Sequence, residues 1–340
     1  MNDISLDFVL IWTLILGVGV FLYVLLDGFD LGVGMLFGFV GTTASRNLIM
    51  NSIAPVWDGN ETWLILGVVG LLAAFPLAFA IIIPAVYFPI AVMLLAFAFR
   101  GVAFEFRYRD IERKSFWDRG FALGSAVATF SQGVVLGAYI QGFKIDGRQF
   151  VGSSFDCFTP FSVVTGVALM LGYTLLGAGW LVIKTEGDLQ AFARRSGRRA
   201  LVGVVLAIVL VSVWTPLSET DIWSRWFSFP NLILLLPIPI LTTALTTVAW
   251  RSFGSSKSQL TPFLSSIGLF ALSFLGIAIS LWPMIVPHHY TLWQAASSEK
   301  TQGFLLVGTV FLLPMVLIYT AWCYWVFRGK VRADLGYHEG

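Results

Sequence analysis

Long apolar segments, separated by short polar loops, recur along the whole chain. Nine can be marked, at about 8–37, 56–78, 80–104, 118–141, 160–183, 200–216, 230–250, 262–284 and 304–327. A segment of about twenty apolar residues is long enough to cross the hydrocarbon core of a bilayer as a helix. The pattern therefore predicts an all-α polytopic membrane protein with about nine transmembrane helices.

The boundary between the second and third segments is the least defined. Pro76 and Pro84 flank the apolar stretch LAFAIII at this point. Two separate helices require a very tight turn near residues 78–80, and the count of nine assumes that turn.

Basic residues are distributed unevenly between the loops. Of the 21 Lys and Arg residues, sixteen fall in the loops after odd-numbered segments or in the C-terminal tail, and four fall in the other loops. Arg100, the remaining one, falls inside a segment. Because cytoplasmic loops carry an excess of Lys and Arg, the N-terminus is expected outside and the C-terminus in the cytoplasm.

The composition excludes several other classes of protein and site. The chain is 57% hydrophobic and 12% charged, with a mean hydropathy of +0.83. It has no polar stretch long enough to fold in water, so residues 1–340 are expected to form a single membrane domain. A net charge of +2 is too small to indicate nucleic-acid binding. Cys157 and Cys323 are predicted on opposite sides of the membrane, which argues against a disulfide or a cysteine metal site.

Ionisable residues interrupt the first three apolar segments and are almost missing from the later ones. They are Asp27, Asp30, Asp58, Glu61, Arg100 and Glu105. A charge at the centre of a lipid-facing helix costs about 2.5–3.5 kcal/mol on insertion scales, so these groups are expected to face the protein interior. In the predicted topology all six lie toward the cytoplasmic side, which concentrates function in the first third of the chain.

The spacing of these carboxylates suggests proton transfer. Asp27 and Asp30 share a helix face, as do Asp58 and Glu61. Crowded carboxylates in a low-dielectric site resist ionising together, and a carboxyl that exchanges its proton near neutral pH can relay protons. Arg100 would hold one carboxylate ionised. The alternative is a structural salt bridge of Arg100 with Asp30 or Asp58, but the excess of carboxylates favours the relay.

Glycine spacing in the first segment predicts close helix packing. Gly28 and Gly32 are four residues apart, as are Gly34 and Gly38, and such pairs allow two helices to approach closely in a bilayer.

Groups that ligate metals or cofactors are scarce. The only histidines are His288 and His289 at the outer end of the eighth segment and His338 in the C-terminal tail. No P-loop, dinucleotide fingerprint or CxxC motif occurs. We therefore expect this chain to ligate no haem or metal and to contain no catalytic residue, so that a partner subunit carries the cofactors.

Three motifs within residues 20–110 resemble subunit II of the cytochrome bd-type quinol oxidases. Residues 28–34 match its GFDxGxG signature, residues 51–63 contain its SIAPxWDGNxxW block, and residues 99–107 match its FRxxxFEFR segment. The resemblance extends over the whole chain, and the compact length is similar to the short, cyanide-insensitive branch.

The resemblance implies a multi-pass protein of the bacterial cytoplasmic membrane with two four-helix bundles and one peripheral helix. It implies that subunit II binds no haem, whereas subunit I carries haem b and haem d, or a further haem b. Subunit I oxidises quinol and reduces dioxygen to water with protons drawn from the cytoplasm. Small single-helix subunits and a structural quinone also occur in the family, but the sequence gives no position for a quinone.

The same resemblance implies roles for individual residues. Asp58 is similar to a member of the proton path, which Asp27, Asp30, Glu61 and Glu105 would assist. Glu105 stands where some members have Asp, which conserves the charge and leaves its role open. Trp57, Asn60 and Arg100 would support the path, and Trp63 would form a wall of the hydrophobic route for dioxygen.

Three functions are consistent with the sequence. The first, which the motifs favour, is a proton-supplying subunit of a respiratory oxidase. The second is a proton-coupled secondary transporter, although paired interrupted helices pointing at a midplane site are not evident. The third is a structural scaffold that shields the cofactors of a partner from lipid.

Overall fold

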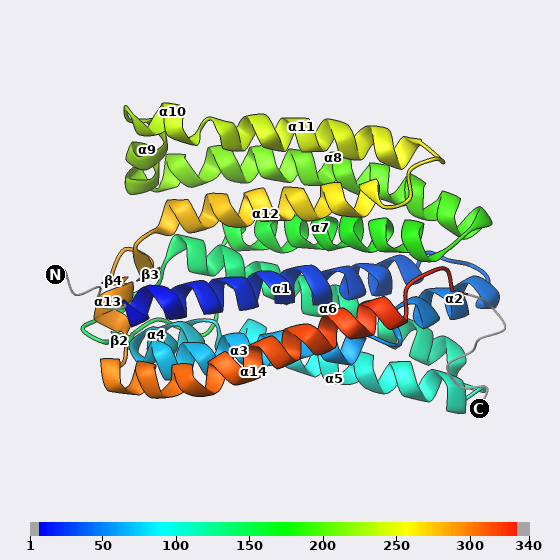
Figure 1. Ribbon diagram of the computed structural model, residues 1–340, viewed down its shortest axis with the longest axis horizontal. Coiled ribbons are helices and arrows are strands. Elements are labelled where there is room, and N and C mark those ends of the chain that lie inside the picture. The colour runs from blue at the N-terminus through cyan, green and yellow to red at the C-terminus, as the bar shows by residue number, and fades with distance from the viewer. Residues whose placement is uncertain (1–6, 332–340) are drawn as a thin grey trace.

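Long helices lie side by side along the length of the molecule in the computed structural model, which describes residues 7–331 (Figure 1). They are α1 (Phe8–Phe37), α3 (Trp57–Ala74), α5 (Tyr87–Arg109), α6 (Lys114–Gln141), α7 (Pro160–Lys184), α8 (Gly187–Ser218), α11 (Pro237–Gly254), α12 (Thr261–Leu281) and α14 (Glu299–Val326).

Short elements lie near the ends of these helices. The short helices are α2 (Thr43–Ile53), α4 (Pro76–Ala85), α9 (Thr220–Phe227), α10 (Asn231–Leu235) and α13 (Leu292–Ala295). Two antiparallel hairpins pair β1 (Ile145–Asp146) with β2 (Gln149–Phe150) and β3 (Met284–Val286) with β4 (Tyr290–Thr291). Only α2 lies at the end where α1, α5, α7, α11 and α14 finish (Figure 1).

Eight helices of the described chain are long and apolar enough to cross a membrane. The prediction of an all-α polytopic membrane protein is therefore confirmed. The second predicted segment corresponds to α3, which is not among these eight and which carries Asp58, Asn60 and Glu61 near its start. Since these polar residues lower its hydropathy, the count of nine crossings stays a prediction.

The predicted tight turn between residues 78 and 80 is wrong. Instead, α3 ends at Ala74, the separate helix α4 follows, and α5 begins only after Val86. Pro76 explains the first break, because proline cannot donate the backbone hydrogen bond that would continue α3 and disfavours helical geometry at the preceding residue. Phe75 accordingly has φ −132° and ψ 63°.

Local sequence signals fix several helix ends. The side chain of Asp7 accepts hydrogen bonds from the first backbone amides of α1, and Thr159 forms a capping box with Ser162 at the start of α7. Gly142 ends α6 with φ +79°, a conformation that favours glycine.

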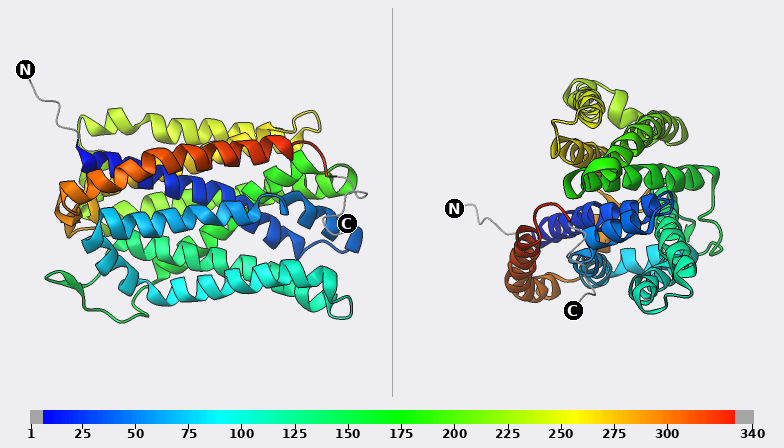
Figure 2. Two further views of the ribbon diagram at one scale, coloured as in Figure 1. Left: turned by 60° about the horizontal axis from the view of Figure 1, so that its bottom comes forward. Right: turned by 90° about the vertical axis from the view of Figure 1, so that its right-hand side faces the viewer.

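The helices divide into layers on either side of α1. In Figure 1, α7, α8, α11 and α12 lie above α1 and α3, α5 and α14 lie below it, whereas α6 starts below α1 and passes behind it. The view along the helices in Figure 2 places α14, in orange and red, at the edge of the bundle. The long helices of the first third of the chain are α1 and, below it, α3 and α5.

Glycines allow α1 and α7 to cross at close range, as their spacing in the first segment predicted. A Cβ atom on Gly32 would lie 1.8 Å from the carbonyl oxygen of Tyr173. On the facing helix, a Cβ atom on Gly177 would lie 2.4 Å from the carbonyl carbon of Gly32. The contact is therefore backbone against backbone, and it fixes the position of α1 beside α7.

Candidate functional site

An ion pair joins α3 to α5 near the end of the molecule that carries α2. Nη1 of Arg100 lies 2.8 Å from Oε1 of Glu61, and only 1% of Arg100 is exposed. The guanidinium also lies over the rings of Trp57 and Phe121, at 5.7 and 5.6 Å from their centroids. Trp57 in turn stacks on Phe104.

The ion-pair partner of Arg100 is neither of the two carboxylates named in the structural alternative. Among the described residues Arg100 pairs with Glu61, and not with Asp30 or Asp58. Asp58 points outward and is exposed, while Asp30 bonds to Asn60. Even so, Arg100 lies near enough to Asp30 for their charges to interact.

Asn60 connects three helices. Its amide nitrogen donates to Oδ2 of Asp30 at 2.6 Å and to the carbonyl oxygen of Leu26 at 3.3 Å. Its amide oxygen accepts a hydrogen bond from the hydroxyl of Tyr324 on α14, at 2.9 Å. Tyr324 was not predicted, because a single uncharged tyrosine in the last apolar segment gives no signal in the sequence.

Asp27 is buried like Asp30 and is 1% exposed. Neither of its oxygens makes a well-formed hydrogen bond with a residue that the structure describes. The hydroxyl of Tyr23, one helical turn earlier, lies beside it, and the charge of Arg100 reaches it. Burying a carboxyl without hydrogen-bond partners costs free energy, and this cost indicates that Asp27 has a functional role.

The remaining predicted residues lie around this cluster. Asp58 is exposed in the first turn of α3, and Glu105 is half-buried on α5. Within residues 7–331, neither side chain makes a hydrogen bond or ion pair. Trp63 is buried on α3, and its indole nitrogen lacks a partner among the same residues. The structure thus gathers Asp27, Asp30, Asn60, Glu61 and Arg100, with Trp57 beside them.

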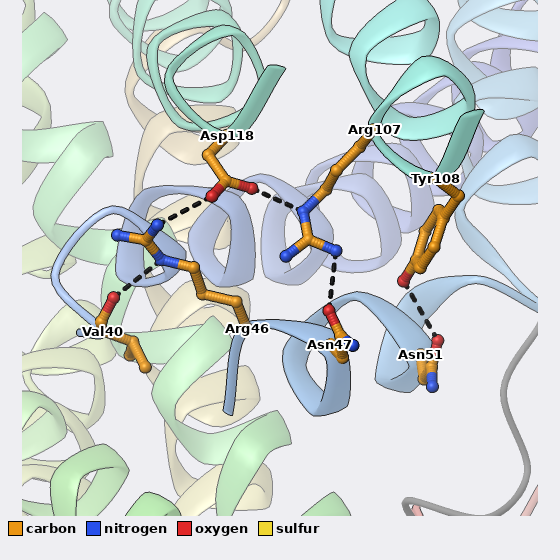
Figure 3. A network of polar contacts seen from close by, with 7 residues as sticks. All are labelled: Val40, Arg46, Asn47, Asn51, Arg107, Tyr108 and Asp118. Atoms are coloured by element: carbon orange, nitrogen blue, oxygen red, sulfur yellow. Dashed lines mark hydrogen bonds and ion pairs between the residues drawn. The ribbon is translucent and has the colours of Figure 1, made fainter. Parts of the chain in front are cut away.

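A second polar network, which the sequence did not predict, lies between α2, α5 and α6 (Figure 3). Asp118 accepts from Nε of Arg107 and lies 2.7 Å from Nη1 of Arg46. Nη1 of Arg107 donates to Oδ1 of Asn47 at 2.8 Å, and Nε of Arg46 donates to the carbonyl oxygen of Val40 at 2.8 Å. Arg107 is fully buried.

Arg46 and Arg107 had no predicted role in the site: both counted as basic loop residues, and Arg107 also ends the FRxxxFEFR segment. One signal in the sequence does point to Arg107, because it lies seven residues after Arg100 and so on nearly the same face of α5. Nothing in the spacing points to Asp118 or Arg46, which reach Arg107 from other helices.

No group of three His, Cys, Asp or Glu side chains in the described part of the chain is arranged to hold a metal ion. His288 lies in the β3–β4 hairpin, at the end opposite α2, with Nε2 3.4 Å from Oε2 of Glu219. His338 lies outside the described residues. The expectation that this chain ligates no haem stays a prediction.

Comparison with known proteins gives consistent matches over nearly the whole chain. A family model described as cytochrome bd terminal oxidase subunit II matches residues 8–327. The cytochrome bd-I ubiquinol oxidase subunit 2 of Escherichia coli K12 is 30% identical over 361 residues, covering 95% of each chain. The cytochrome bd ubiquinol oxidase subunit 2 of Bacillus subtilis 168 is 31% identical over 337 residues, covering 96% of each.

A solved structure shares the fold. A chain of the bd oxidase from Geobacillus thermodenitrificans superposes with a TM-score of 0.77, covering 95% of this chain and 99% of that one. Its sequence identity is 16%, so this likeness shows the fold alone.

Proposed function

Since this chain belongs to the family of cytochrome bd terminal oxidase subunit II, we propose that it is the haem-free subunit of its oxidase and supplies that enzyme with protons. Family membership makes it part of a respiratory quinol oxidase with a partner subunit I. In the proposal, subunit I holds haem b and haem d, or a further haem b, and reduces dioxygen to water. This chain supports the assembly of the complex and carries protons from the cytoplasm toward the haem site of subunit I.

The graded burial of the carboxylates is the observation that carries this proposal. Asp58 is exposed, the side chain of Glu61 is 26% exposed, and Asp30 and Asp27 are buried. A proton taken up at Asp58 would pass Glu61 to reach Asp30 and Asp27. Glu105, half-buried on α5, would assist as a further carboxylate.

Uncharged and cationic neighbours would support this path. Arg100 compensates the charge of Glu61 and, through its interaction with Asp30, limits the cost of burying a second carboxylate. Asn60 orients Asp30 by a hydrogen bond, and Trp57 packs under the guanidinium. Trp63, buried on the same helix, is assigned to the wall of a hydrophobic route for dioxygen.

The proposed topology places the end with α2 in the cytoplasm, because the basic loops lie there. Nine crossings then include α3. The chain forms one membrane domain, in which α1, α3, α5 and α6 make one four-helix bundle, α7, α8, α11 and α12 make the other, and α14 is peripheral. The complex resides in the bacterial cytoplasmic membrane, together with quinol and any small subunits or structural quinone.

A tagged chain, purified from its own membranes in mild detergent, tests the proposal. A reduced-minus-oxidised spectrum should show haem b bands, and a gel should show a second, larger polypeptide. Asp58→Asn should then lower quinol oxidase turnover per haem while the haem content is kept.

Each other outcome supports a different function. If Asp58→Asn and Asp27→Asn both keep the full turnover per haem, the proton-supply role is wrong and the scaffold function stands. A colourless protein without a partner would instead favour the secondary transporter, against which family membership now argues.

A further inference from the structure

Buried polar side chains continue from Asp27 into α6 and α7, beyond the three motifs of the family resemblance. Tyr173 on α7 is fully buried, and its hydroxyl donates to Oε1 of Gln132 on α6 at 2.9 Å. Gln132 is 9% exposed, and its amide nitrogen has no hydrogen-bond partner among residues 7–331. A polar pair thus lies where the lower and upper helix groups meet.

The ring of Tyr173 lies directly against α1, next to Asp27. A Cβ atom on Gly28 would lie 2.6 Å from Cε1 and 3.0 Å from Cζ of that ring. Only glycine leaves this space, so the absence of a side chain at position 28 lets the ring reach the backbone beside Asp27. The hydroxyls of Tyr23 and Tyr173 both lie close enough to Asp27 to interact with its charge.

Unpaired polar atoms collect around this ring. Both oxygens of Asp27, the hydroxyl of Tyr23 and the amide nitrogen of Gln132 are buried without a well-formed hydrogen bond to any described residue. Leaving such groups unpaired is unfavourable, and buried water commonly satisfies them with about three hydrogen bonds each. Since the atoms come from α1 and α6 on either side of Tyr173, bound water could link all of them.

We propose that Tyr23, Tyr173 and Gln132 form a hydrogen-bonded arm that, together with bound water, holds and orients the carboxyl of Asp27. The direction of the bonds follows from the contacts. The hydroxyl of Tyr173 donates its proton to Gln132, so the phenolic oxygen is left as an acceptor for the bound water that would link it to the carboxyl of Asp27. The amide nitrogen of Gln132 donates to the bound water.

The arm ends at Gln132, because an amide does not exchange a proton as a carboxyl does. It therefore holds the proton of Asp27 in place and does not conduct it onward. Tyr173 and Gln132 are positioning residues, and this inference rests on the proposed proton-supply function.

Conservative variants of the intact oxidase complex test the arm. Tyr173→Phe removes only the hydroxyl and keeps the ring against Gly28, and Gln132→Met removes the amide with little change in shape. Tyr139→Phe is the matched control, because the hydroxyl of Tyr139 on α6 donates to the carbonyl oxygen of Ile285 instead.

Two readouts are measured on each variant. Quinol oxidase turnover per haem should fall about three- to tenfold in Tyr173→Phe and Gln132→Met, the rate equivalent of one hydrogen bond, and stay unchanged in Tyr139→Phe. In infrared difference spectra, the carboxyl C=O band that disappears in Asp27→Asn should move to higher frequency in Tyr173→Phe. A purely structural role would lower the yield of complex without moving this band.

The outcomes separate the arm from the proposed function. Wild-type turnover and an unshifted band in both arm variants would overturn the arm, even if Asp27→Asn is slow. Wild-type turnover in Asp27→Asn would remove the role of Asp27 itself, and the arm with it. Should Tyr173→Phe assemble poorly, turnover per haem in Gln132→Met decides, because this change leaves the contact with Gly28 intact.

Discussion

Replacing Asp118 by Asn tests whether the network between α2, α5 and α6 holds that end of the molecule together. The change removes the one carboxylate shared by Arg107, which is fully buried, and Arg46, whose side chain is 27% exposed. Breaking a buried ion pair from one side costs about 3–5 kcal/mol. We expect the lower limit, about 3 kcal/mol, because Asn47 still accepts from Arg107 and an asparagine keeps one acceptor oxygen.

The matched variant is Arg46→Ala, which removes the partly exposed partner and leaves the buried one in place. It should cost no more than about 1 kcal/mol, the usual upper value for an exposed ion pair. Heat denaturation of the purified complex, followed by tryptophan fluorescence, measures both changes. At about 2 °C per kcal/mol for a large domain, Asp118→Asn should lower the midpoint by roughly 6 °C. Equal shifts for the two variants would refute the importance of burial at Arg107.

Two further predictions concern packing and pH. Gly32→Ala should prevent recovery of the assembled complex, because its Cβ would lie 1.8 Å from the carbonyl oxygen of Tyr173, whereas Gly17→Ala on the same helix meets nothing within 4 Å and should assemble normally. A hydrogen bond from Lys144 lowers the pKa of Asp156 in the loop before α7, so the stability that this pair contributes is present at neutral pH and lost as the pH falls through the lowered pKa. The hydrogen-exchange protection factors of residues 142–159, which are corrected for the intrinsic slowing of exchange in acid, should therefore fall on acidification more in the wild type than in Lys144→Ala, and an equal fall in both would contradict the assignment.

The apolar pattern was sufficient to predict the helices because backbone polar groups in lipid must bond within their own segment. Proline cannot meet this requirement, because it has no backbone N–H to donate, and its position therefore sets a helix boundary. Pro76 ends α3 and starts α4, a break that hydropathy alone could not place because the residues on both sides are apolar. The alternating direction of the helices also followed from the loops, and it brought Asp27, Glu61 and Arg100 to the same end of the molecule.

The pairing of these charges was not predictable in the same way. Helix direction fixes the depth of a residue, but the rotation of each helix about its axis decides which side chains meet. That rotation depends on packing, as where Gly32 meets the backbone of α7. Asn60, which carries no charge, consequently makes the contact with Asp30 that the structural alternative had offered to Arg100.

The network around Arg107 also affects the proposed proton path, because it holds α2 in place and α2 leads directly into α3. Arg46 and Asn47 attach α2 to α6 and α5, and the chain passes from the end of α2 at Ile53 to the start of α3 at Trp57. The start of α3 carries the exposed Asp58 and the partly exposed Glu61 of the path. Its position therefore depends on a cluster to which the proposal assigns no proton, and the two arginines of that cluster served in the sequence chiefly as a guide to topology.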